Sequence, residues 1–160
     1  MLCSLSPTSY LEIVGPDSEQ SGITAARPFG IDELTEVTLV SWAIGVADME
    51  SASAAAREAG YDPGHARAMQ RRRPDDTVLS WRLTAVVSRT VPFLIDWGTS
   101  PHPAETAAPG LVLGELRARH PRPAELTKTL DAVGVSMGVE HGDEGLVIEI
   151  HGPLGSVQFG

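Results

Sequence analysis

The pattern of apolar and polar residues divides the first part of the chain into short strands around one helix. Residues 10–14 alternate and are β-prone, and the turn residues Gly15, Pro16 and Asp17 end them. Residues 18–36 are rich in polar and turn-forming side chains, which predicts a long connecting loop. The apolar run 37–46 predicts a strand that is buried on both faces.

A helix and three strands are predicted next. Asp48 is a suitable N-cap for a helix over residues 49–59, and Gly60 is a suitable C-terminal stop. Strands are expected at 65–72, 77–86 and 92–97, the first two joined by a turn at 74–76. From residue 37 the order is therefore β-α-β-β-β.

The same order recurs in the last part of the chain. A strand at 111–118 precedes a helix over 124–133, with Pro123 suited to its first turn, and strands follow at 135–140, 146–151 and 157–159. A Gly-x-x-x-Gly spacing closes both helices. The sequences LEIVGP (11–16) and IEIHGP (148–153) share four residues in register, which indicates an internal repeat.

These patterns predict one α+β domain of 160 residues, built from repeated βαβββ modules. Residues 1–36 are interpreted as the remnant of a first module and a connecting loop, 37–110 as a second module and 111–160 as a third. The helices are expected on the outer face of curved mixed sheets that enclose a cleft.

Composition excludes several classes of protein. The net charge of −9 disfavours nucleic-acid binding, and the basic run at residues 71–73 is followed at once by Asp75 and Asp76, as in a solvated hairpin tip. The single cysteine, Cys3, cannot form an intrachain disulfide and fits a reducing compartment, so we expect a cytoplasmic protein. No run reaches the ~18 apolar residues of a membrane helix.

Five separated blocks carry a resemblance to a known family: YLEIVGPDSEQ, RPFGIDELT, AGYDPG, RRRPDDTVLSWRLT and PFLIDWGTSPHPA. Together they resemble glyoxalase-like domain proteins of the vicinal oxygen chelate superfamily, which includes glyoxalases, bleomycin resistance proteins and dioxygenases. The family's opening strand-helix-strand unit, with an early histidine, has no counterpart here. We therefore expect a homodimer in which a partner covers the sheet edge left unpaired.

The resemblance implies a divalent metal in the cleft, held by histidine or glutamine and carboxylate side chains. It places Glu12 where a module supplies its carboxylate, whereas Ser41 and Trp42 stand where another ligand is expected. Glu149 and His151 are two apart in a predicted strand, so they share one face and form a candidate half-site. The alternatives are a polar pocket wall for Glu12, a solvated face for the pair, and no metal at all.

Other side chains are candidates for catalysis or substrate binding. His102 is a candidate general acid or base, and Asp96 is a candidate to orient a histidine or to accept from an arginine, although both also fit an ordinary surface turn. Arg82 is a candidate clamp for an acidic substrate. The three tryptophans, Trp42, Trp81 and Trp97, are candidate cleft walls.

Three functions remain open from the sequence. One is a metal-dependent lyase, isomerase or dioxygenase-like enzyme acting on a small oxygenated metabolite. The second is a small-molecule binding module without turnover. The third is a truncated family member that mainly self-associates.

Overall fold

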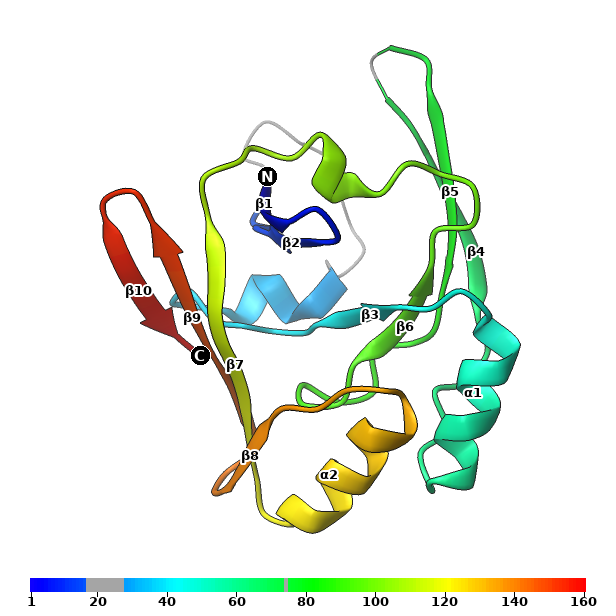
Figure 1. Ribbon diagram of the computed structural model, residues 1–160, viewed down its shortest axis with the longest axis vertical. Coiled ribbons are helices and arrows are strands. Elements are labelled where there is room, and N and C mark those ends of the chain that lie inside the picture. The colour runs from blue at the N-terminus through cyan, green and yellow to red at the C-terminus, as the bar shows by residue number, and fades with distance from the viewer. Residues whose placement is uncertain (17–27, 74) are drawn as a thin grey trace.

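The computed structural model describes residues 1–16, 28–73 and 75–160 and confirms the α+β class. Within these ranges, ten strands form a hairpin and two four-stranded sheets, accompanied by two α-helices and two short 3-10 helices. Figure 1 shows the two larger sheets on opposite sides of the molecule, with the N-terminal hairpin between them. None of the described helices is long and apolar enough to span a membrane.

The first four-stranded sheet is built by the second predicted module. It contains β3 (Ala43–Gly45), β4 (Arg67–Arg72), β5 (Val78–Leu83) and β6 (Phe93–Asp96), with α1 (Met49–Glu58) between β3 and β4. The strand order is β3-β6-β5-β4, with β3 parallel to β6 and the other pairs antiparallel. The module's first strand therefore lies at an edge of its sheet.

The second four-stranded sheet is built by the third predicted module. It contains β7 (Val112–His120), β8 (Gly138–His141), β9 (Gly145–Gly152) and β10 (Gly155–Phe159), with α2 (Pro123–Ala132) between β7 and β8. The strand order is β10-β9-β7-β8, with β7 parallel to β8. Here the first strand lies inside the sheet, so the two segments share an element order but not a strand arrangement.

The N-terminal hairpin forms a sheet of its own. Strands β1 (Leu2–Ser6) and β2 (Ser9–Glu12) pair antiparallel. The Ser4 N–H donates to the Ala108 carbonyl at 2.8 Å, which ties β1 to the chain just before β7. The 3-10 helices η1 (Pro28–Glu33) and η2 (Pro103–Glu105) lie on either side of this hairpin in Figure 1.

Both predicted helices are present; α1 has the expected side-chain cap at its N-terminus, whereas α2 begins at Pro123 and has no side-chain cap. The Asp48 carboxylate accepts hydrogen bonds from the N–H and the hydroxyl of Ser51, both at 2.9 Å. Gly60 and Gly134, just beyond α1 and α2, have φ of 95° and 78°, a left-handed conformation that glycine adopts at little cost. Local sequence therefore sets both helix boundaries.

The main core lies between α2 and the second sheet. Leu126 and Leu130 of α2 pack with Ala118 of β7 and Leu146 of β9, all buried. Leu39 and Trp42, from the segment before β3, pack against this cluster. This segment therefore links the main core to the first sheet.

The predicted buried strand at 37–46 is wrong in extent. Only Ala43–Gly45 is a strand, and Val37 is 81% exposed. β3 is an edge strand that pairs with β6 alone, so the residues before it have no strand partner and follow the α2 core instead. The strand predicted at 10–14 also ends at Glu12, and part of the predicted loop 18–36 forms η1, while residues 18–27 lie outside the described part.

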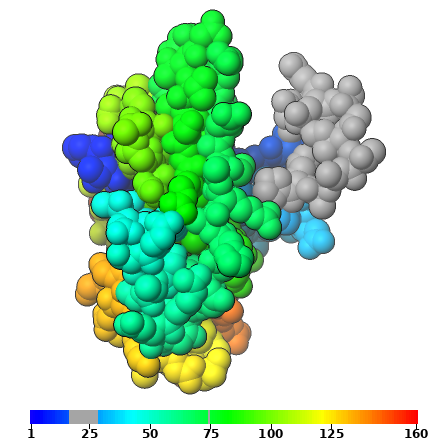
Figure 2. All heavy atoms as spheres, turned by 90° about the vertical axis from the view of Figure 1, so that its right-hand side faces the viewer, coloured from blue at the N-terminus to red at the C-terminus, as the bar shows by residue number. Residues whose placement is uncertain are grey.

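The basic run belongs to an exposed hairpin, as expected. All residues of β4 are exposed, and the Arg72 guanidinium pairs with the Asp76 carboxylate at 3.5 Å. Figure 2 shows the β4–β5 hairpin projecting from the body of the protein. These cations therefore lie on a solvated projection.

Candidate functional site

A central cleft of about 400 Å³ lies among the N-terminal hairpin, the first sheet and the second sheet. Its walls come from segments that are far apart in sequence. The lining residues are mostly apolar or aromatic, including Phe29, Leu39, Trp42, Phe93, Ile95, Trp97, Leu116 and Ile148. Such an apolar pocket with a few polar groups is the usual form of a small-molecule site.

The cleft brings together four of the candidate site residues named from the sequence: Glu12, Trp42, Trp97 and His102. Trp81 lies next to them, with its ring centroid 5.3 Å from that of Trp97. The indole N–H of Trp42 donates to the Thr90 carbonyl at 3.0 Å, which fixes this ring in the wall. The predicted aromatic wall is therefore assembled mainly from Trp42 and Trp97.

His102 is held by the 3-10 helix that follows it. Its Nδ1 accepts a hydrogen bond from the Ala104 N–H at 3.2 Å, and its own N–H donates to the Glu105 carboxylate at 3.2 Å. The ring lies 5.6 Å from the Tyr10 ring and 6.1 Å from the Trp97 ring. Because Nδ1 is an acceptor here, the neutral imidazole carries its proton on Nε2 and can donate from that atom.

Tyr10 is a cleft residue that sequence reasoning missed. Burial, with a smaller contribution from Glu12, raises the pKa of its hydroxyl to about 12. The phenol therefore keeps its proton at neutral pH, and it has no hydrogen-bond partner among the residues that the structure describes. Its position two residues before Glu12 was the available signal, since alternate residues of a strand share a face.

Two further wall residues have unusual local environments. The Ser41 hydroxyl is buried without a hydrogen-bond partner among the described residues, a rare condition for a polar group. Phe29 has φ of 64°, which is strained for a bulky side chain. The sequence marked Ser41 only as an unexpected residue at a ligand position, and nothing in it pointed to Phe29.

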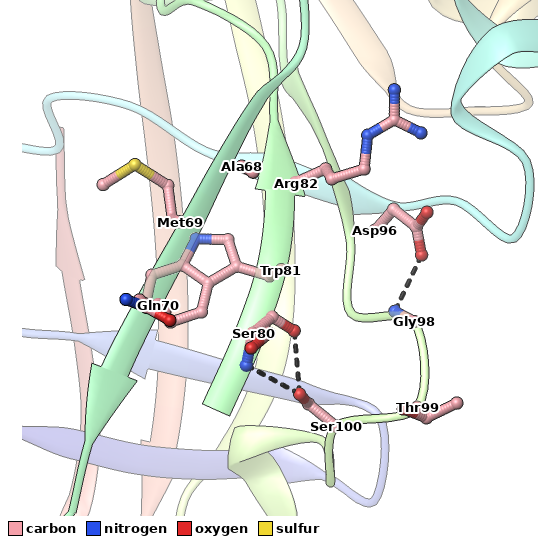
Figure 3. Close-up of a pocket in the computed structure, with 10 residues that line it drawn as sticks. All are labelled: Ala68, Met69, Gln70, Ser80, Trp81, Arg82, Asp96, Gly98, Thr99 and Ser100. Atoms are coloured by element: carbon pink, nitrogen blue, oxygen red, sulfur yellow. Dashed lines mark hydrogen bonds between the residues drawn. The ribbon is translucent and has the colours of Figure 1, made fainter. Parts of the chain in front are cut away.

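Asp96 and Arg82 lie outside the central cleft. They border a separate surface groove of about 540 Å³ with Trp81, Gln70 and Ser100 (Figure 3). Phe93 and Ile95 of β6 line the central cleft, so alternation directs Asp96 to the opposite face of the sheet.

Both charged groups of this groove already have partners. The Asp96 carboxylate accepts from the Gly98 N–H at 2.8 Å, as in the surface-turn alternative. The Arg82 guanidinium donates to the Glu50 carboxylate of α1 at 2.6 Å, and this bond holds the pKa of Glu50 below its usual value. The structure thus separates Asp96 from His102, while the catalytic and clamping roles stay predictions.

Glu149 and His151 project together from β9, as their spacing predicted, but away from the cleft. Ile148 lines the cleft and Ile150 is buried, so the intervening residues face the other side. His151 Nδ1 lies 3.9 Å from the Glu149 carboxylate and 2.6 Å from the Ser156 hydroxyl. Its ring covers Gly114 of β7, where a Cβ atom would collide with it.

Comparison with known proteins gives one finding. A family model described as "Glyoxalase-like domain" matches residues 1–134. The chain belongs to the glyoxalase-like domain family. Neither a curated protein nor a solved structure shows a match. The family match supports the resemblance to vicinal oxygen chelate proteins, and the loss of an opening unit stays a prediction.

The described donors of this glyoxalase-like protein do not by themselves form a site for a divalent ion. Within the described ranges, no three side chains of His, Cys, Asp and Glu gather closely enough to hold a metal. Glu12 lines the cleft, whereas Glu149 and His151 project from the far face of the second sheet. Since zinc takes about four ligands and octahedral ions about six, neither position supplies a site by itself.

Proposed function

We propose that this glyoxalase-like protein binds a small oxygen-bearing organic molecule in the central cleft. The observation that supports this proposal is an apolar, aromatic wall that also contains the Tyr10 phenol, the His102 imidazole and the Ser41 hydroxyl, the last buried without a partner among the described residues. A buried polar group is rarely left unpaired, so a ligand that supplies a hydrogen bond accounts for the Ser41 hydroxyl. Binding of this kind needs no metal.

A steric block tests this proposal. Ala43 lies in the wall of the central cleft, and Ala68 lies in the surface groove on the other face of the sheet. Ala43→Trp fills part of the cleft, and Ala68→Trp is the matched control. We expect a panel of small ketones, aldehydes and acids to change the tryptophan emission of the wild type, because Trp42 and Trp97 border the cleft.

The expected pattern is loss of the response in Ala43→Trp and retention in Ala68→Trp, each variant being normalised to its own unliganded spectrum. A panel that leaves emission and melting temperature unchanged in all three proteins contradicts binding in the cleft. Equal responses in both variants contradict the placement of the site. Circular dichroism establishes that each variant is folded.

A metal-dependent lyase, isomerase or dioxygenase-like activity is the second candidate, favoured by the position of Glu12 in the cleft wall. A metal that binds only the native state raises the melting temperature by mass action. A chelator is therefore expected to lower the melting temperature if this candidate holds, and Glu12→Ala to lower metal occupancy. Binding without metal predicts no change in either measurement.

A further inference from the structure

We infer that the central cleft selects neutral aromatic molecules with a carbonyl oxygen, and discriminates against matching carboxylates and hydrocarbons. This inference rests on the proposed function, since it names the ligand class of the same site. Three observations support it: the cleft has polar groups that can donate, its described lining residues include no Lys or Arg, and its walls are aromatic.

The unpaired polar groups can all donate. Burial keeps the Tyr10 phenol protonated, and because Nδ1 of His102 accepts from the Ala104 N–H, Nε2 is the ring nitrogen that can donate. The Ser41 hydroxyl, buried in the same wall, also has a proton without an acceptor among the described residues. A ligand oxygen with free lone pairs satisfies these groups, and a hydrocarbon leaves them unpaired at a cost.

The charge of the cleft disfavours anions. Among the described lining residues there is no Lys or Arg, and Glu12 is the one carboxylate. The candidate clamp, Arg82, borders the other groove and is paired with Glu50. A ligand carboxylate entering the cleft would lose solvation without gaining a cation and would face Glu12, whereas a ketone carries no such charge.

The walls favour a flat ligand. Phe29, Trp42, Phe93 and Trp97 all line the cleft, and the Trp97 ring meets the His102 ring edge-on. Aromatic rings pack best against other rings in offset or edge-to-face contact, so an aromatic ligand gains more here than an aliphatic one of equal size. The volume of about 400 Å³ admits a molecule of that kind.

Three probes of nearly equal size separate these effects: acetophenone, ethylbenzene and benzoate. Dissociation constants are measured by ligand-observed NMR titration of the full chain near neutral pH. One satisfied hydrogen bond predicts that acetophenone binds about 3- to 10-fold more tightly than ethylbenzene. Benzoate is expected to bind at least about 10-fold more weakly than acetophenone, because its charge is desolvated without a partner.

Two variants test whether hydroxyl groups of the cleft cause the preference for acetophenone over ethylbenzene. Tyr10→Phe and Ser41→Ala each remove a hydroxyl from the cleft and are expected to reduce the ratio of the ethylbenzene and acetophenone dissociation constants towards one. Tyr61→Phe is the matched control. The Tyr61 hydroxyl, like that of Ser41, is buried and unpaired among the described residues, and burial raises its pKa as it does that of Tyr10, but Tyr61 does not line the cleft. That variant is expected to keep the wild-type ratio.

The outcomes separate a failure of the carbonyl preference from a failure of the proposed binding in the cleft. Equal affinities for acetophenone and ethylbenzene, or tighter binding of benzoate, overturn the carbonyl preference while cleft binding stands. A preference that survives both cleft variants overturns the assignment of the donors. If none of the three probes binds the wild type, the proposed function falls together with the inference.

Discussion

Glu144 forms hydrogen bonds with the loop that contains Ser88 and Thr90 and supports the cleft wall. Replacing Glu144 with alanine is expected to destabilise the protein. Its carboxylate accepts hydrogen bonds from the Ser88 hydroxyl at 2.6 Å and from the Thr90 hydroxyl at 3.1 Å. Thr90 is fully buried, and its carbonyl accepts from the indole of Trp42, which lines the cleft. The contact therefore joins the turn before β9 to the tryptophan wall.

The size of the expected destabilisation follows from the hydrogen bonds that Glu144→Ala removes. Glu144→Ala leaves the buried Thr90 hydroxyl with the Ser88 oxygen as its remaining partner, at 3.1 Å. Hydrogen bonds to charged groups contribute about 1.5–3 kcal/mol, and because Glu144 itself is exposed we discount this to about 1–2 kcal/mol. For a domain of this size, the melting temperature is expected to fall by about 3–6 °C.

The pH dependence has a definite sign. The hydrogen bond from Ser88, helped by that from Thr90, holds the pKa of the Glu144 carboxyl below its ordinary value, against the opposing effect of partial burial. A depressed folded-state pKa stabilises the protein above the unfolded value of about 4.3, and this contribution is lost as pH falls through the folded value. The difference between wild type and Glu144→Ala is therefore expected at pH 7 and should shrink below about pH 4.

The assay is urea unfolding at pH 7 and at acidic pH, followed by tryptophan emission. Asp143→Ala, in the same turn, is the matched control, because its carboxylate forms no hydrogen bond with the described residues, and it is expected to match the wild type. A loss in Glu144→Ala that is no larger than in Asp143→Ala, or that persists unchanged in acid, would refute this account of the contact.

Three further predictions concern ionisation, packing and assembly. Burial raises the pKa of both tyrosines, and Tyr10 is expected to ionise only near pH 12, so absorbance titration at 295 nm should show a phase near pH 12 that disappears in Tyr10→Phe. Its raised pKa stabilises the fold fully below pH ~10, a contribution lost as pH rises through 12. Leu130→Ala should lower the free energy of unfolding in urea by about 2–5 kcal/mol, because Leu130 is 1% exposed in the α2 core. A smaller decrease would mean that the neighbouring side chains relax into the cavity. We propose that the protein forms a homodimer in which a partner covers the sheet edge left unpaired by the absent opening unit. Sedimentation showing only monomer at micromolar concentration contradicts this, and a dimer that binds no ligand favours the self-associating alternative.

The sequence by itself determined the local structure. Capping at Asp48, the glycines at 60 and 134, and the alternation along 146–151 specify helices and a strand through contacts within a few residues. The same alternation placed Glu149 and His151 on one face. The resemblance pointed correctly to the family. Glu12 lines the cleft, while its role as a metal ligand stays a prediction.

The tertiary structure alone decided which residues share a site. Period-two alternation states that Trp81 and Arg82 point to opposite faces, but not which face borders the cleft, because that depends on the neighbouring strands and the covering helix. Strand order is equally non-local: β3 lies at an edge and β7 inside, although both open a β-α-β-β-β segment. Hence 37–46 forms only a short strand, Asp96 is parted from His102, and Tyr10, Phe29 and Ser41 enter the cleft through contacts that link distant parts of the chain.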